Sequence, residues 1–116
     1  RIETHYFVVA VNQQSQIVGF SSITPQGYLH SMFVHKDFQG EGIATMLLEE
    51  IERYAITAGI TRITSEVSLT ARPFFEKKGY VVEKEQKRKA NQLSLTNFLM
   101  AKEVAFLEYY NKKVTD

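Results

Sequence analysis

The first third of the chain consists of short apolar runs separated by polar stretches. The runs Phe7–Val11 and Ile17–Ile23 flank the polar residues 12–16, and Tyr28–Val34 follows a turn that contains Pro25. Short apolar runs bounded by turn residues are typical of β-strands. We therefore predict that the first two runs form a β-hairpin and that the third run is the next strand.

A helical period replaces this pattern from Gly42 to Ala58. Apolar residues recur there at spacings of three and four, which predicts an amphipathic helix. The following run, Thr61–Val67, is β-branched and alternating, which predicts a strand. A strand, a helix and a strand of this length form a right-handed crossover with parallel strands. We expect strands 28–34 and 61–67 to be parallel neighbours in a mixed, mostly antiparallel sheet with helices on both faces.

The last part of the chain predicts a short helix and a closing hairpin. Residues 71–78 have a brief helical pattern. The stretches 80–83 and 93–100 predict two strands, and the charged run 84–89 between them predicts the exposed tip of the hairpin. Residues 103–116 are expected to form a C-terminal helix or tail.

Composition narrows the classes of protein to which the chain can belong. Residues 1–116 are expected to form one domain, and an apolar content of 44% is enough for a packed core. A net charge of +1 gives no reason to expect nucleic acid or an anionic membrane as a partner. There is no cysteine, and His5, His30 and His35 lack the spacing of metal ligands. We expect a cytoplasmic protein without a metal. Because the chain begins with Arg1 and not Met, we expect a fragment or a trimmed chain.

The strongest chemical signal lies where the third strand passes into the helix. Gly40 and Gly42 have no Cβ, so backbone N–H groups in this loop can approach an oxyanion closely. The first N–H groups of the helix and the positive end of its dipole point into the same loop, which predicts a phosphate site. The loop does not match a Walker motif, because Ile43 and Ala44 follow Gly42. A dinucleotide fingerprint would need a third glycine where Thr45 stands.

Two blocks of sequence resemble one enzyme family. The segment Gln39–Ala44 has the pattern Q/R-x-x-G-x-G/A, which is motif A of the GNAT family, the Gcn5-related N-acetyltransferases. The segment Ala71–Tyr80 is similar to motif B of that family at its alanine, glycine and aromatic positions. Two residues depart from motif B, since Ser68 stands where the family has Asn and Phe75 stands where it has Tyr.

This resemblance implies a GNAT-like acyl-CoA N-acyltransferase fold of the α/β class, without the family's usual first strand and helix pair. It implies acetyl-CoA as the co-substrate and a primary amine of a small molecule or peptide as the acceptor. Ser68 could contact CoA or could instead cap the short helix. The candidate cofactor-binding residues are Met32, Phe33, Val34, Gln39, Gly40, Glu41, Gly42, Ile43, Ala44, Ser68 and Phe75.

The acceptor amine must lose a proton before it attacks the thioester, which calls for a base. His30 is a candidate catalytic residue because it lies on the motif A strand and because histidine titrates near neutral pH. Glu66 is the second candidate, since it lies near the end of the parallel strand, where sites of open sheets gather. The plainer interpretations are a hydrogen-bonded histidine and an edge carboxylate. Tyr6 and Tyr28 are alternative acids that fit packing roles equally well.

Phe75 keeps rival hypotheses open. In the family, the Tyr at this position often protonates the leaving CoA thiolate, and Phe75 has no hydroxyl group. The active N-acetyltransferase is therefore weighed against a catalytically weak acyl-CoA-binding module and against a nucleotide-binding regulatory domain. Because the family's usual N-terminal elements are missing, we also expect a homodimer, or the tail 104–110, to cover apolar surface.

Overall fold

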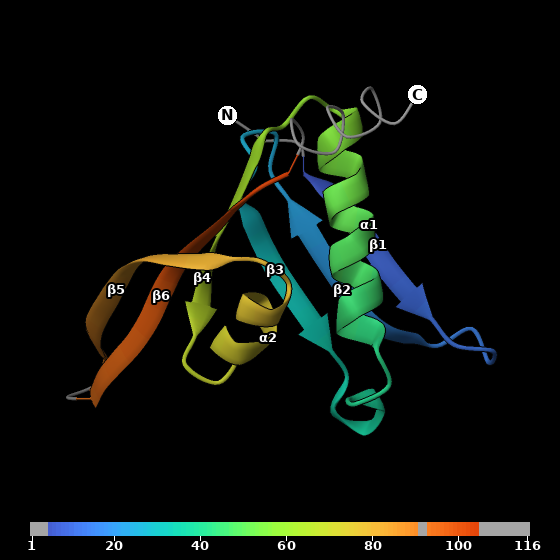
Figure 1. Ribbon diagram of the computed structural model, residues 1–116. Coiled ribbons are helices and arrows are strands. Elements are labelled where there is room, and N and C mark those ends of the chain that lie inside the picture. The colour runs from blue at the N-terminus through green and yellow to red at the C-terminus, as the bar shows by residue number, and fades with distance from the viewer. Residues whose placement is uncertain (1–4, 91–92, 105–116) are drawn as a thin grey trace.

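The computed structural model describes residues 5–90 and 93–104 of the chain. Six strands, two α-helices and one 3₁₀ helix follow one another in these residues (Figure 1). In chain order they are β1 (Tyr6–Val11), β2 (Ile17–Ile23), β3 (Leu29–Val34), the 3₁₀ helix η1 (Lys36–Phe38), α1 (Ile43–Thr57), β4 (Arg62–Ser68), α2 (Arg72–Lys77), β5 (Val81–Ala90) and β6 (Leu93–Glu103).

The strands form two antiparallel sheets, with the orders β1-β2-β3 and β4-β6-β5. The sheets meet where β3 and β4 begin, through a parallel bridge between Tyr28 and Thr64. The Thr64 N–H donates to the Gly27 carbonyl at 2.9 Å, and the Ser65 hydroxyl donates to the Leu29 carbonyl at 3.1 Å. The two strands are therefore parallel, as predicted, but only at their first residues. Beyond the bridge they diverge, so one continuous sheet is replaced by two sheets arranged as a V (Figure 1).

Both α-helices lie on the same side of the sheets. Helix α1 packs on β1, β2 and β3, and α2 packs against β4. The prediction of helices on both faces is therefore wrong for the described residues. The reason is that the inner faces of both sheets and the apolar faces of both helices pack together in one core. Buried members of this core include Ile23, Leu29, Leu48, Ile51, Ala55, Ile63, Val67, Phe75, Tyr80, Phe98 and Met100. None of the helices in the described part of the chain is long and apolar enough to cross a membrane.

The charged run 84–89 lies inside β5 and not at a hairpin tip, which corrects the sequence prediction. An edge strand exposed to water tolerates charged side chains, and these charges discourage pairing with another chain. Arg62 on β4 pairs with Glu83 of β5 and with Glu103 of β6, so charged residues also tie this sheet together. Glu103 ends β6 and Val104 is buried in the core, while residues 105–116 of the expected C-terminal helix or tail lie outside the described residues.

A polar cluster fastens α1 to the second sheet. Tyr80 is only 2% exposed, and its hydroxyl donates to Glu52 Oε2 of α1 at 2.8 Å. Lys102 of β6 donates to both carboxylate oxygens of Glu52 at 3.2 Å. Burial and the neighbouring Glu52 carboxylate raise the pKa of Tyr80 well above its ordinary value. The hydroxyl therefore stays protonated and holds α1 against the start of β5.

The outer face of the first sheet is apolar and open. On β1, β2 and β3 the side chains that point away from α1 include Phe7, which is 65% exposed, and Phe20 and Phe33, whose rings lie 5.4 Å apart. No helix among the described residues covers this face. Apolar patches of this kind usually mark an interaction surface. The expected homodimer, or a cover from residues 104–110, stays a prediction.

We predict that Gly27→Ala destabilises the protein by about 3 kcal/mol or more, measured by urea unfolding. Gly27 has a φ of +93°, and a Cβ there would lie 2.4 Å from the Arg62 carbonyl oxygen. The matched control is Gly59→Ala, since Gly59 has a φ of +80° but no atom within 4 Å of an added Cβ. It should lose only the conformational term of roughly 1 kcal/mol. Equal losses of stability in the two variants would show that the close approach of Gly27 to the Arg62 backbone is not needed to join the two sheets.

We predict that Tyr80→Phe lowers the free energy of unfolding by about 2 kcal/mol near neutral pH, because a hydrogen bond to a carboxylate is lost. Above pH 10 the unfolded state of the wild type loses its Tyr80 proton while the folded state keeps it. Wild-type stability then falls with rising pH, and the gap to the variant should narrow by about 1.4 kcal/mol per pH unit. A gap that stays constant up to pH 11.5 would disprove the raised pKa.

Candidate functional site

The loop between β3 and α1 is shaped by its own side chains. The Gln39 side-chain amide donates to the Val34 carbonyl at 3.2 Å, and His35 Nδ1 accepts from the Asp37 N–H at 3.1 Å. Gly40 and Gly42 both have a φ of +83°, which side chains other than glycine rarely adopt. Gly42 is the N-cap of the 15-residue helix α1, and no side chain caps this terminus. The helix therefore presents its first N–H groups and its positive dipole end at the loop.

A groove of about 520 Å³ runs beside this loop and under α2. A Cβ added at Gly40 or Gly42 would meet no atom within 4 Å, so the space over the loop is open to a ligand. The floor and walls are mostly apolar, while the loop supplies backbone donors at one end. The predicted residues that line the groove are Met32, Val34, Gln39, Gly40, Gly42, Ile43, Ala44 and Phe75.

A second cavity of about 250 Å³ continues from the groove into the gap between β3 and β4. Met32, Ala71 and Phe75 line both spaces, so an elongated ligand can pass from one to the other. The gap exists because β3 and β4 stop pairing after their first residues. We call this second cavity the slot.

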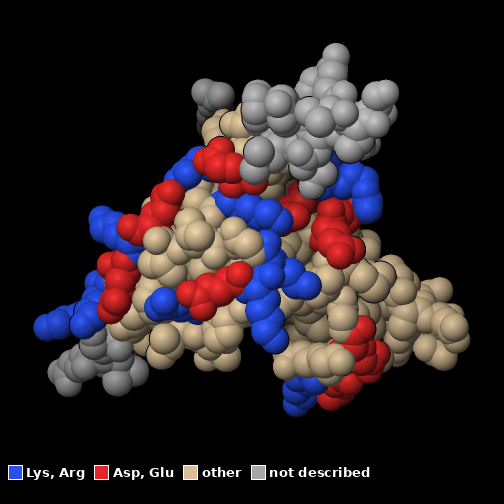
Figure 2. Space-filling model, viewed as in Figure 1, with Lys and Arg blue, Asp and Glu red and all other residues tan. Residues whose placement is uncertain are grey.

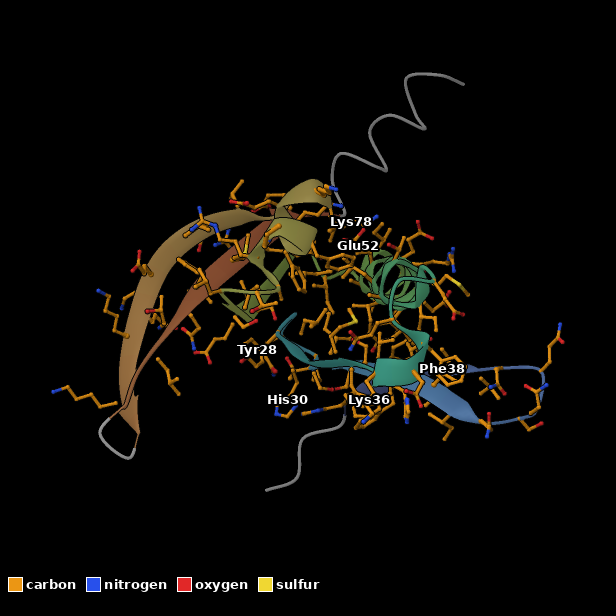
Figure 3. The ribbon with its side chains drawn as sticks, turned by 90° about the horizontal axis from the view of Figure 1, so that it is seen from below. Tyr28, His30, Lys36, Phe38, Glu52 and Lys78 are labelled. Carbon is orange, nitrogen blue, oxygen red and sulfur yellow. The ribbon has the colours of Figure 1, made fainter. Side chains whose placement is uncertain are left out.

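The structure brings the two candidate catalytic residues together at the slot. His30 of β3 and Glu66 of β4 both line it, from opposite sides. The His30 ring lies 5.2 Å from the ring of His5 and 6.2 Å from that of Tyr28. Figure 3 shows Tyr28 and His30 on the side of β3 that faces away from α1. The slot is therefore bordered by Phe75 of α2 on one side and by His30 on the other.

Of the remaining predicted residues, Ser68 lines the slot, whereas Phe33 and Glu41 line neither space. Phe33 is 49% exposed on the outer face of the first sheet, so only its backbone can serve the groove. Glu41 lines a separate hollow beside the β1–β2 turn. The Ser68 hydroxyl accepts from the Ala71 N–H at 3.1 Å, so it caps the start of α2, and Ser68 also lines the slot. Tyr6 stacks on Tyr54 of α1 and does not line either space.

Phe75 is buried between the two spaces. Its ring meets those of Phe74 and Tyr80 edge to face, each at 5.3 Å. Phe74 and Thr45 also line the groove, and sequence reasoning missed both. Phe74 could have been found from the sequence. It lies three residues after Ala71, and Phe75 lies four residues after it, so all three residues share one face of the short helix.

Positive charge gathers near the groove. Lys and Arg side chains lie between α2 and α1 in the view of Figure 2. The Lys78 ammonium lies 5.6 Å from the centre of the Phe74 ring, which itself lines the groove. This charge favours an anionic ligand at the mouth of the groove. Among the described residues no group of His, Asp and Glu is arranged to hold a metal ion.

Comparison with known proteins decides the family. A family model described as an acetyltransferase (GNAT) domain matches residues 1–103. The chain belongs to the GNAT acetyltransferase family. The resemblance seen in its two motifs is thereby confirmed, and so is the predicted α/β fold class.

Individual relatives agree with this assignment. An uncharacterised N-acetyltransferase, YafP of Escherichia coli K12, is 30% identical over 98 residues, which cover 84% of this chain and 60% of the relative. A GCN5-related N-acetyltransferase from Rhodopseudomonas palustris superposes with a TM-score of 0.77 at 29% identity, over 85% of this chain and 61% of that one. The chain thus spans about three fifths of the length of both proteins. An aminoglycoside 6′-N-acetyltransferase complexed with coenzyme A has the same fold, with a TM-score of 0.75 at 22% identity, over 86% and 73% of the two chains.

We predict that Gly42→Val weakens CoA binding at least tenfold in isothermal titration calorimetry while the protein stays folded. The left-handed backbone costs about 1–2 kcal/mol of stability with a side chain, and the added methyl groups occupy the open space over the loop. Gly59→Val is the control, because it has a similar φ of +80° and lies far from the loop at the other end of α1. It should lose similar stability without losing CoA affinity. Unchanged affinity in Gly42→Val would remove the loop from the binding site.

Proposed function

We propose that the chain is an acetyl-CoA-dependent N-acetyltransferase that acts on a primary amine of a small molecule or peptide. The observation that carries this proposal is the continuity of the groove with the slot. The groove begins at the uncapped N-terminus of α1 and its two left-handed glycines, and it ends between two diverging strands that present His30 and Glu66.

The donor fits the groove by its chemistry. Acetyl-CoA carries a pyrophosphate, which suits the backbone donors from Gly40 to Ala44 and the positive helix end. Its amide-bearing arm can run along Met32 and Val34, because β3 has lost its pairing with β4 there and an extended ligand can take the place of a strand. Phe75 shields the arm from water. The thioester then lies in the slot.

The acceptor enters the slot from the side of His30 and Glu66. One of these residues takes a proton from the ammonium group, and the free amine attacks the thioester carbon. A C–N bond forms, the C–S bond breaks, and the sulfur leaves as a thiolate, while the nitrogen releases its extra proton to water or to the departing thiolate. An ordinary thiol has a pKa of about 8.5, so the thiolate can leave near neutral pH without an acid at Phe75.

A catalytically weak acyl-CoA-binding module is the second candidate function, because Phe75 offers no proton to the thiolate. Calorimetry with acetyl-CoA, CoA and ATP tests both proposals together. Binding of ATP without binding of CoA would instead favour a nucleotide-binding regulatory domain. A thiol-release assay over a panel of amines separates the active enzyme from the weak module.

We predict that His30→Ala removes the acidic limb of the pH–rate profile, because that limb reports protonation of the catalytic base. If His30 is the base, kcat should fall by about 10²–10⁴-fold while KM for acetyl-CoA holds. Glu66→Gln is the companion variant and should keep the limb. Loss of the limb in Glu66→Gln alone would assign the base to Glu66. An unchanged profile in both variants would contradict the proposed roles of both residues.

A further inference from the structure

A row of polar side chains on the second sheet begins at the slot. Strand register pairs Ser68 of β4 with Asn97 of β6, and Asn97 with Gln86 of β5. The neighbouring Val67 and Phe98 point into the core. By strand alternation the row therefore lies on the face away from the helices. Because Ser68 lines the slot, the row runs away from it in steps of roughly 5 Å, the spacing between strands.

Two side-chain oxygens in this row are unsatisfied. Gln86 Oε1 and Asn97 Oδ1 are buried, and neither has a hydrogen-bond partner in the part of the chain that the structure describes. A buried acceptor without a donor is costly, and folded proteins contain few of them. The terminal torsions of Asn and Gln are broad. Each amide can therefore turn to present its oxygen to a ligand and gain a bond that it lacks.

The surroundings of the row narrow the chemistry of its ligand. Glu66 and Lys84 stand on the same face, since both are register partners of Leu99. Lys84 precedes Gln86 by two residues, so its ammonium group lies near the outer end of the row. A ligand group at that end must offer N–H donors to two carbonyl oxygens. A neutral amide does so without repulsion from Lys84.

We propose that the acceptor is a primary alkylamine with N–H donors at its far end, and that Asn97 and Gln86 bind this end while the reacting amine lies in the slot. The proposal rests on the proposed N-acetyltransferase function and names the class of its acceptor. Two strand spacings separate Ser68 from Gln86, so the acceptor is elongated by roughly 10 Å. A lysine side chain with its backbone amides and a linear diamine both present this chemistry, and Lys84 favours the lysine.

The test compares three amines with the same reacting end. They are Nα-acetyl-lysine N-methylamide, 1,5-diaminopentane and 1-aminopentane, and the assay is thiol release from acetyl-CoA. In the wild type, kcat/KM for the lysine derivative should exceed that for 1-aminopentane by about tenfold, with the diamine between them. In the double variant Asn97→Leu, Gln86→Met this ratio should fall to near one. Gln14→Met is the control for an amide outside the row, because Gln14 lies in the β1–β2 turn.

The double variant should also melt at or above the wild-type temperature, because it removes two unsatisfied oxygens. A lower melting temperature would show that the amides serve the fold and would overturn the proposal. So would a ratio that is near one in the wild type or unchanged in the double variant. If no amine is acetylated although CoA binds, the proposed function fails. Melting temperatures measured in the presence of CoA then test the row separately. Adding the lysine derivative must raise the melting temperature of the wild type more than that of the double variant, and an equal rise would overturn the proposal.

Discussion

The parallel bridge between β3 and β4 is the constraint on which the rest of the structure depends. Gly27 allows the backbone of Arg62 to come close, and Tyr28 and Thr64 then join the two sheets at their first residues. After this point the two strands still run in the same direction, but they no longer pair with each other. The slot is therefore a property of the backbone. His30 and Glu66 line this slot, and the bridge is the reason that the slot exists.

The same divergence connects the slot to the end of the groove that lies at the glycine loop. Strand β3 runs from the bridge to the glycine loop, and α1 returns over the first sheet from that loop. The short segment 29–43 thus has the open edge of β3 at one end and the uncapped N-terminus of α1 at the other. A ligand with a phosphate at one end and an amide-bearing arm can satisfy both ends at once. The hydrogen bonds of Tyr80 and Lys102 to Glu52 join α1 to the second sheet beside this segment.

Much of this arrangement could be predicted from the sequence, because its signals are local. Strand β2 coincides with the predicted Ile17–Ile23, and α1 begins one residue after Gly42, since period and glycine chemistry act over a few residues. The extent of β5 could not be predicted, because an exposed edge strand with charged residues has the composition of a turn. The separation of the sheets also escaped prediction, since it depends on contacts between residues far apart in the chain. For the same reason the sequence did not show that Asn97 and Gln86 are neighbours.

In the proposed complex one ligand, acetyl-CoA, occupies the glycine loop and the open edge of β3 together. The most direct test is to follow the backbone amide signals by NMR while CoA is added to the ¹⁵N-labelled protein. The largest shifts should fall on two groups, the loop amides of residues 40–44 and the strand amides of residues 32–34. Both groups should saturate at the same CoA concentration. Shifts confined to the outer face of the first sheet, or an unchanged spectrum at millimolar CoA, would contradict the proposed complex.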